Sequence, residues 1–271
     1  MRIKVLMFAA SLLLISNVSP GAPQTPSGTS NSPQRDPQAV TTIQNALVAM
    51  GGTSAIAQVQ NVIARGSSVP APGIGDPSGN VTMEDLFSAQ GHEFKDAFES
   101  ATLTQTFVSG HGSPGRLSNG HTEQFAPFVA NSRLAAHLPA MLLAGALANA
   151  TCSIDLIGPS AINGQAAIQV RLHIDTDIVQ QTLSVQDWYF DSLTHLPVRI
   201  EYRIPDTTNA LFFLHAAADF SDFRPVQGVL FPFHLLAYVD SKPRDVLTFS
   251  SITVNQPIAS ADFDLSVAVT Q

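Results

Sequence analysis

The chain has 271 residues with 13 basic and 21 acidic side chains, so its formal net charge is −8 at pH 7. Nucleic acid and anionic membrane surfaces repel such a chain, which excludes both as expected partners. The single cysteine, Cys152, excludes an internal disulfide, so stability must come from a packed core. We expect Cys152 to be a small buried residue at the start of a strand.

The first 21 residues predict an export signal rather than a buried helix. Arg2 and Lys4 give a positive start, and Val5 to Ile15 form an uncharged apolar run that is too short to span a bilayer. Small and turn-forming residues follow, and cleavage after Gly21 fits them best. No cysteine stands near this position to carry a lipid. We therefore expect an exported protein, periplasmic or extracellular, with no acyl or transmembrane anchor.

Residues 22–35 are predicted to be a disordered linker, because they are rich in Pro, Ser, Thr and Gly and nearly free of apolar residues. The folded domain is expected to span residues 36–271. Asp36 followed by Pro37 is typical of a helix start, and Gly51 with Gly52 is typical of a helix end. Between them, apolar residues recur at helical spacing: Val40, Ile43, Leu47 and Met50. This pattern predicts an amphipathic helix from Pro37 to Met50.

From Val59 onward the pattern favours short strands. Clusters of Gly, Pro, Ser and Asn separate four extended segments: Gln60–Val69, Asn80–Ala89, Glu93–Ser100 and Thr102–Ser109. The stretch from Phe125 to Ala150 is predicted to be helical instead. Pro127 and Pro139 each suit a first turn, which indicates two consecutive helices.

The second of these predicted helices, Pro139–Ala148, has no charged residue and is apolar on all sides. A helix of this kind is either buried or inserted into something. About ten residues cannot cross a membrane. Two interpretations stay open: the helix plugs the sheet as plain core, or it forms the lid or wall of a lipid-binding cavity.

The second half alternates apolar and polar residues, as half-buried antiparallel strands do. The alternation runs from Ile168 to Ile174 and from Val198 to Ile204, and Asn163-Gly164 is typical of a hairpin turn. Phe231–Tyr238 and Val246–Val254 add two more strands, and Trp188 is expected in a strand. The predicted fold is mainly β (α+β): a single antiparallel meander forming an unclosed barrel curled over two or three helices.

Four stretches of the second half combine turn-forming residues with apolar core residues. They are Trp188–Asp191, Leu196–Glu201, Asp222–Phe233, and Ile252–Ile258 with Phe263. In these stretches the chain resembles the lipoprotein-carrier-like family of exported proteins, the outer-membrane lipoprotein-sorting or LolA-like group. The resemblance implies an unclosed β-barrel folded over helices, often with an apolar cavity that holds acyl chains. Fold alone does not decide function.

No segment of the sequence predicts catalysis. Gly110 to Gly115 matches the glycine spacing of dinucleotide-binding loops, but Pro114 interrupts it and no helix opens directly after it. Ser113 lies near His111 without a nucleophile elbow. The carboxylate pairs Glu84-Asp85 and Asp219/Asp222 are expected to be solvated, and Glu84 and Asp85 should point to opposite faces of a strand. We therefore predict that the protein is not an enzyme.

A metal site is not expected either. No two histidines lie at helical i,i+4 spacing, and His111 with His121 is the only loose pairing. We expect the eight histidines to be scattered over the surface: His92, His111, His121, His137, His173, His195, His215 and His234. No cofactor is predicted.

The leading hypothesis is a binding module that shelters an apolar ligand, a lipid or an acyl group, or binds an acylated partner, outside the cytoplasm. The alternative is a structural or accessory protein that buries its own helix and acts through protein contacts. Under the leading hypothesis, the apolar helix and the packed faces of the alternating strands line the cavity. The predicted lining residues are Met141, Leu142, Leu143, Val170, Leu172, Val198, Ile200 and Tyr202.

Overall fold

The computed structural model describes residues 33–71, 81–88, 93–109, 115–124, 136–175, 182–205 and 212–264. The predicted export signal, the helix expected at Pro127, and His92, His111 and Ser113 lie outside these ranges. The described residues form three α-helices and one 3-10 helix: α1 (Pro37–Ala49), α2 (Thr53–Ala57), α4 (Pro139–Ala148) and η1 (Ser260–Phe263). The helices predicted to begin at Pro37 and at Pro139 are confirmed.

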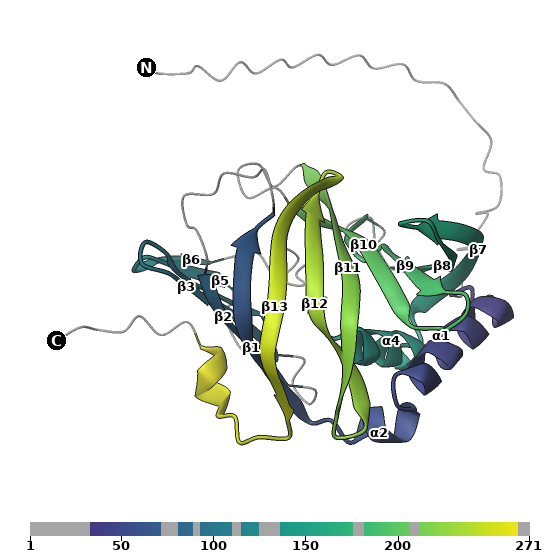
Figure 1. Ribbon diagram of the computed structural model, residues 1–271, viewed down its shortest axis with the longest axis horizontal. Coiled ribbons are helices and arrows are strands. Elements are labelled where there is room, and N and C mark those ends of the chain that lie inside the picture. Colours follow the sequence, from purple (N-terminus) through teal and green to yellow (C-terminus); the bar gives the residue numbers. More distant parts are fainter. Residues whose placement is uncertain are drawn as a thin grey trace, which may run out of the picture. The chain divides into compact units, whose positions relative to one another are not determined.

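Thirteen described strands make one antiparallel sheet (Figure 1). Six precede α4: β1 (Asn61–Pro70), β2 (Val81–Ser88), β3 (Glu93–Glu99), β4 (Thr104–Ser109), β5 (Gly115–Ser118) and β6 (His121–Gln124). Seven follow it: β7 (Cys152–Ile162), β8 (Gln165–Ile174), β9 (Gln186–Asp191), β10 (Pro197–Pro205), β11 (Phe213–Val226), β12 (Val229–Val239) and β13 (Lys242–Val254).

The sheet is a meander whose two halves meet where β13 pairs with β1. Strands β1 to β6 follow one another outward from this junction, and β7 to β13 lead back to it. The edge strands are β6 and β7, which do not pair with each other, so the barrel is unclosed. The predicted mainly β fold is confirmed, including the placement of Trp188 in β9.

Tight turns set the strand pairing, because residues with positive φ suit two-residue hairpins. Asn163 and Gly164 have φ values of 51° and 81° and join β7 to β8, as the sequence predicts. Asn119 and Gly120 have φ values of 46° and 81° and join β5 to β6 in the same way. The same Asn-Gly signal therefore marks a hairpin that the strand prediction omitted.

Helix α1 begins and ends as its sequence predicts. The Asp36 side chain accepts hydrogen bonds from the backbone N–H groups of Gln38 and Ala39, which have no partner inside the helix. At the other end, Gly51 has a φ of 120°, and a Cβ there would lie 2.1 Å from the Gly228 carbonyl oxygen. Only glycine fits this approach of the α1 end to the β11–β12 turn.

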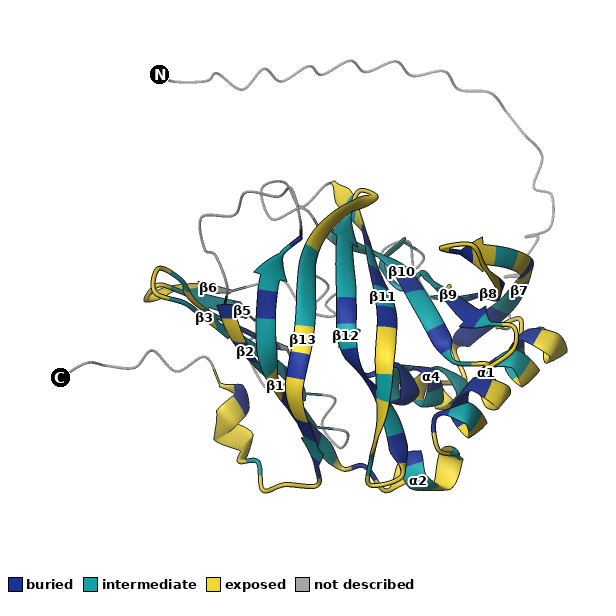
Figure 2. Ribbon diagram, viewed as in Figure 1, coloured by how far each residue is buried: buried dark blue, intermediate teal, exposed yellow. Residues whose placement is uncertain are grey.

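The three helices contact one another and the β7–β13 half of the sheet. Helix α1 lies against β7, β8 and α4, and α4 also lies against α2 and β12 (Figure 1). Buried residues lie along the strands and in α1 and α4 (Figure 2), and those of helices and strands belong to one cluster. The largest fully buried side chains include Trp188, Phe190, Phe231 and Phe249. The main core therefore lies between the helices and the sheet.

The folded part begins slightly before the predicted boundary. Arg35 forms a parallel bridge with Ile154 of β7, and the Ile154 N–H donates to the Gln34 carbonyl at 2.7 Å. The prediction that the disordered linker runs through Arg35 is wrong at this end. Polar composition alone did not reveal that the edge of β7 offers backbone partners to these residues.

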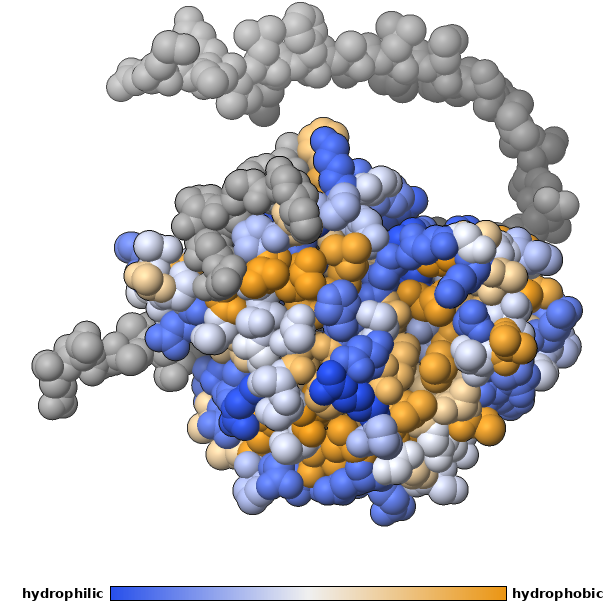
Figure 3. Space-filling view, viewed as in Figure 1, coloured by the Kyte–Doolittle hydropathy of each residue, from blue (hydrophilic) through white to orange (hydrophobic). Residues whose placement is uncertain are grey.

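The surface reflects the low charge of the chain, in which only 13% of residues are charged. On the face drawn in Figure 3, apolar side chains gather in patches between hydrophilic ones. Large apolar residues that are exposed include Leu193 in the β9–β10 hairpin and Phe212 just before β11. Some apolar surface is normal in folded proteins, so these patches alone do not define a site.

Candidate functional site

A pocket lies between α4 and the strands β7, β8 and β9. Its volume is about 170 Å³. Apolar and polar groups share its wall, which is lined by Leu142, Gly145, Ala146, Asn149, Cys152, Leu172, His173, Ile174, Ser184 and Gln186. Leu142 and Leu172 are two of the residues that the sequence analysis predicted to line a cavity.

Helix α4 supplies one wall of this pocket. Pro139 stands in its first turn, and neither terminal turn carries a charged residue. One side of the helix, including Ala140 and Leu143, is buried in the main core. Met141, Leu142 and Leu147 are only partly buried. The helix thus presents apolar side chains beyond those that the core covers.

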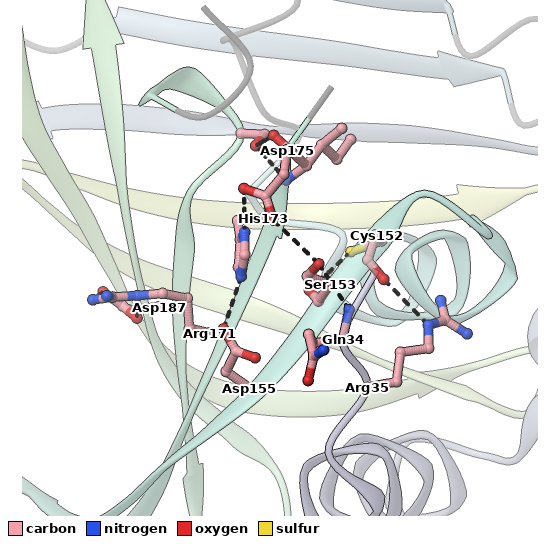
Figure 4. Close-up of polar contacts among 11 residues, drawn as sticks. Gln34, Arg35, Cys152, Ser153, Asp155, Arg171, His173, Asp175 and Asp187 are labelled. Atoms are coloured by element: carbon pink, nitrogen blue, oxygen red, sulfur yellow. Dashed lines mark hydrogen bonds and ion pairs between the residues drawn. The ribbon is translucent and has the colours of Figure 1, made fainter. Parts of the chain in front are cut away.

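Arg35 caps the C-terminal end of α4, where the last carbonyl groups of a helix lack internal partners. Its Nη2 donates to the carbonyls of Ala146 and Asn149 at 2.9 and 2.8 Å, and its Nη1 donates to Leu147 at 3.1 Å. Its Nε donates to the Cys152 carbonyl at 3.2 Å, which ties the helix end to β7 (Figure 4). The guanidinium also complements the negative end of the helix dipole.

His173 occupies the polar rim of the pocket and bridges two carboxylates (Figure 4). Its Nε2 lies 2.7 Å from Asp155 Oδ2, and its Nδ1 lies 2.9 Å from Asp175 Oδ1. Burial, the largest single influence, lowers the pKa of His173, but the hydrogen bonds and charges of Asp175 and Asp155 together outweigh it and raise the pKa. Two acceptors on one ring require both nitrogens to be protonated, so the geometry favours the imidazolium.

Cys152 lies in the same pocket wall and is buried. Burial raises the pKa of its thiol, and the Sγ atom donates to the Ser153 carbonyl at 3.4 Å. A thiol with a raised pKa is a poor nucleophile at neutral pH. As predicted, Cys152 is a small buried residue at the start of a strand.

Five of the other six predicted lining residues belong to the main core or pack against it instead of lining the pocket. Leu143, Val170 and Ile200 are fully buried in it, and Met141 and Tyr202 pack against it while partly buried. Together with Leu142 and Leu172, these residues form one cluster on the helix-facing side of the sheet.

Val198 is not part of this cluster, so the expectation that it shares a face with Ile200 is wrong. It packs against a second cluster made of Ile162, Ala167 and Tyr189. The register between β9 and β10 shifts between Pro197 and Arg199, and such a bulge changes the side of the sheet to which a residue points. The regular apolar alternation from Val198 to Ile204 concealed this shift.

Two expectations about polar residues are also wrong. Asp85 was expected to be solvated, yet it is 2% exposed, and His137, expected at the surface, is 6% exposed. The alternation of Val81, Met83 and Asp85 places this carboxyl group on the apolar face of β2, which was a readable signal. His121, in contrast, is exposed in β6.

Within the described ranges, no group of three or more His, Cys, Asp or Glu side chains is arranged to hold a metal ion. In the same ranges, no helix combines the length and the apolar character needed to cross a membrane.

Solved structures share this arrangement of sheet and helices. The chain matches a putative outer membrane lipoprotein-sorting protein domain from Vibrio parahaemolyticus with a TM-score of 0.52 and 11% identity, over 84% of this chain and 96% of that one. A DUF1329 family protein from Desulfovibrio piger matches with a TM-score of 0.52 and 12% identity, over 84% and 98% of the two chains. A LolA superfamily protein from Nitrosomonas europaea matches with a TM-score of 0.51 and 12% identity, over 83% and 97%.

The class of fold is therefore that of the lipoprotein-sorting, LolA-like proteins, as the sequence resemblance implied. No protein-family model matches the sequence, and the search of curated proteins found no match. At 11–12% identity, the likeness defines the fold but not the ligand, which depends on this chain's own residues.

Proposed function

We propose that this protein is an exported binding module that shelters an apolar ligand, a lipid or an acyl group, in the manner of a carrier. The LolA-like fold supports this proposal, because similar chains include a lipoprotein-sorting protein. The polar chemistry beside the pocket supports binding rather than catalysis. The Cys152 thiol is buried, and both nitrogens of His173 are engaged by carboxylates.

The observation that carries the proposal is the environment of α4. Every residue of this helix is apolar or glycine, yet Met141, Leu142 and Leu147 are only partly buried. Leaving apolar surface in water is unfavourable by roughly 25 cal/mol per Å². A ligand that covers these side chains would gain this free energy, whereas a helix that served only as core should bury them.

The pocket beside α4 is one end of the proposed binding site rather than all of it. Sites for small molecules typically enclose about 300–1,000 Å³, and this pocket measures about 170 Å³. An acyl chain would therefore enter only when α4 moves away from β8. Helix α4 is joined to the N-terminal segment by Arg35, so its movement would strain those hydrogen bonds.

The direct test is an organic extract of protein purified from its native host, analysed by mass spectrometry. We expect lipids or acylated molecules in stoichiometric amount, and uptake of a neutral apolar dye by protein from which they have been removed. A chain that carries no lipid and takes up no dye would favour the alternative, an accessory protein that acts through protein contacts.

A further inference from the structure

Two carboxyl groups meet on the inner face of the sheet, and neither lines the pocket beside α4. Asp85 of β2 and Asp96 of β3 are direct partners in the antiparallel register. Asp85 also pairs with Ala64 of β1, which is fully buried in the main core. Directly opposite residues hold their Cβ atoms about 4.5–5.5 Å apart on one face, where two like charges repel.

His137, two residues before α4, contacts Asp85. Its Nδ1 lies 3.4 Å from Asp85 Oδ2, and its ring centroid lies 5.3 Å from that of Phe249 and 6.1 Å from that of Phe94. Burial lowers the pKa of His137 to about 3, so the ring is neutral at physiological pH. A neutral imidazole can accept a hydrogen bond from protonated Asp85. It carries no positive charge that would offset the charge of an ionised carboxylate.

Asp85 has unused hydrogen-bonding capacity. Its side chain is 2% exposed, and its Oδ1 has no hydrogen-bond partner among the described residues. Burial first, and then the charge and hydrogen bond of Asp96 and the charge of Glu84, raise the pKa of Asp85 well above its ordinary value. A buried acceptor without a donor destabilises the fold, and such groups cluster at functional sites. An apolar side chain at this position would leave no polar atom in the core without a hydrogen-bond partner.

We propose that Asp85, together with Asp96 and His137, holds the headgroup of the sheltered amphiphile, and that this headgroup carries a protonated primary amine. The inference rests on the proposed function, because it concerns the polar end of the same ligand. An ammonium group supplies N–H donors to Oδ1, and its positive charge favours the ionised form of the carboxyl groups, which then attract it. A carboxylate head would add a third acidic group at this place and be repelled.

The test compares three ligands with the same twelve-carbon chain: dodecylamine, dodecanol and dodecanoic acid. Each is titrated at neutral pH into the lipid-free full mature chain, and displacement of a neutral apolar dye is measured. We expect dodecylamine to bind more tightly than dodecanoic acid by roughly tenfold or more, as a charge-assisted hydrogen bond predicts. Asp85→Asn should remove most of this preference and leave dodecanol binding within about threefold.

Glu84→Gln is the matched control, because it removes one carboxylate from the neighbouring position of β2. Glu84 points to the other side of the strand and pairs with Arg65. The control should keep the preference for the amine. Asp96→Asn replaces Asp85→Asn if the latter does not fold, and it should weaken amine binding in the same direction.

The outcomes separate the two proposals. If the alcohol and the acid bind as tightly as the amine, or if Asp85→Asn and Glu84→Gln behave alike, the headgroup assignment is wrong while the binding module stands. If none of the three compounds displaces the dye, or the dye itself does not bind, both proposals fail.

Discussion

Neighbouring residues of α4 have different roles in the structure. Leu143 is fully buried, and Leu142, one position along, is partly buried and lines the pocket with Leu172. Successive residues of a helix point about 100° apart, so one can face the core while the next faces a pocket. Helix α4 therefore contributes to the core and to the pocket wall through different side chains.

This difference predicts unequal effects of truncation. Leu143→Ala should lower the free energy of unfolding by about 2–5 kcal/mol, which is large against a typical total of about 5–15 kcal/mol. Leu142→Ala should lie near the bottom of that range or below, because a pocket residue has fewer partner atoms to lose. Urea unfolding measures both values, and dye uptake should weaken in Leu142→Ala. Equal, severe losses at both positions would make α4 plain core.

The ionisation of His173 predicts a stability that depends on pH. Its pKa is raised in the folded protein, so the stabilisation is fully present below the unfolded value of about 6.5 and is lost as pH rises through the folded value. The urea-unfolding midpoint of wild type should exceed that of His173→Gln at low pH. This difference should become smaller as the pH rises through the folded pKa. His195→Gln, at an exposed position in the β9–β10 hairpin, serves as the control for loss of a histidine side chain.

At the scale of elements, the N-terminal segment, α4 and β7 form one unit. Arg35 donates to three carbonyls at the end of α4 and to the Cys152 carbonyl at the start of β7. The backbone of Gln34 and Asp36 exchanges hydrogen bonds with Ile154 of β7. The same segment therefore covers the edge of the sheet and caps the helix that forms the pocket wall.

Removal of this cap should loosen the pocket wall. Arg35→Ala is expected to lower the free energy of unfolding by about 1–3 kcal/mol, because several carbonyls lose a charged donor. Arg35→Lys should recover only part of this, since an ammonium cannot donate in the fork geometry of a guanidinium. Hydrogen exchange should rise first in α4 and at the start of β7. If Lys restored full stability, the charge alone would explain the role of Arg35.

At the scale of the whole fold, the sheet is divided into two environments. The β7–β13 half lies against the three helices, and α4 reaches as far as β12. The β1–β3 region carries the buried Asp85 and the half-buried Asp96 opposite it on its inner face. An amphiphile with its chain near α4 and its headgroup near Asp85 would contact both environments.

Ligand binding should therefore stabilise the fold as a whole. Removal of bound lipid is expected to lower Tm, and addition of an apolar ligand at 100 times its Kd should restore about 2.7 kcal/mol by mass action. Thermal unfolding of loaded and extracted protein checks this. An unchanged Tm would contradict binding to the folded state.

The mainly β fold has a separate check. A far-ultraviolet circular dichroism spectrum dominated by helix would contradict it.

Sequence alone determined the local elements of this protein. Asp36 and Pro37 predict the start of α1, Asn163-Gly164 predicts the β7–β8 hairpin, and the apolar run after Pro139 predicts α4. Each of these features depends on residues a few positions apart, where capping, turn conformation and side-chain period act directly. The same local rules indicated a mainly β chain, and the resemblance of several stretches to the LolA-like family implied the unclosed barrel.

Only the tertiary structure decided which residues meet. The bulge beside Val198, the pairing of Asp85 with Asp96, and the approach of His137 to Asp85 depend on strand register and on packing between distant segments. A shift of one residue turns every following side chain to the other face, and no local pattern records it. The pocket wall and the burial of Asp85 follow from contacts across the sheet, since burial is a property of the whole fold rather than of a segment.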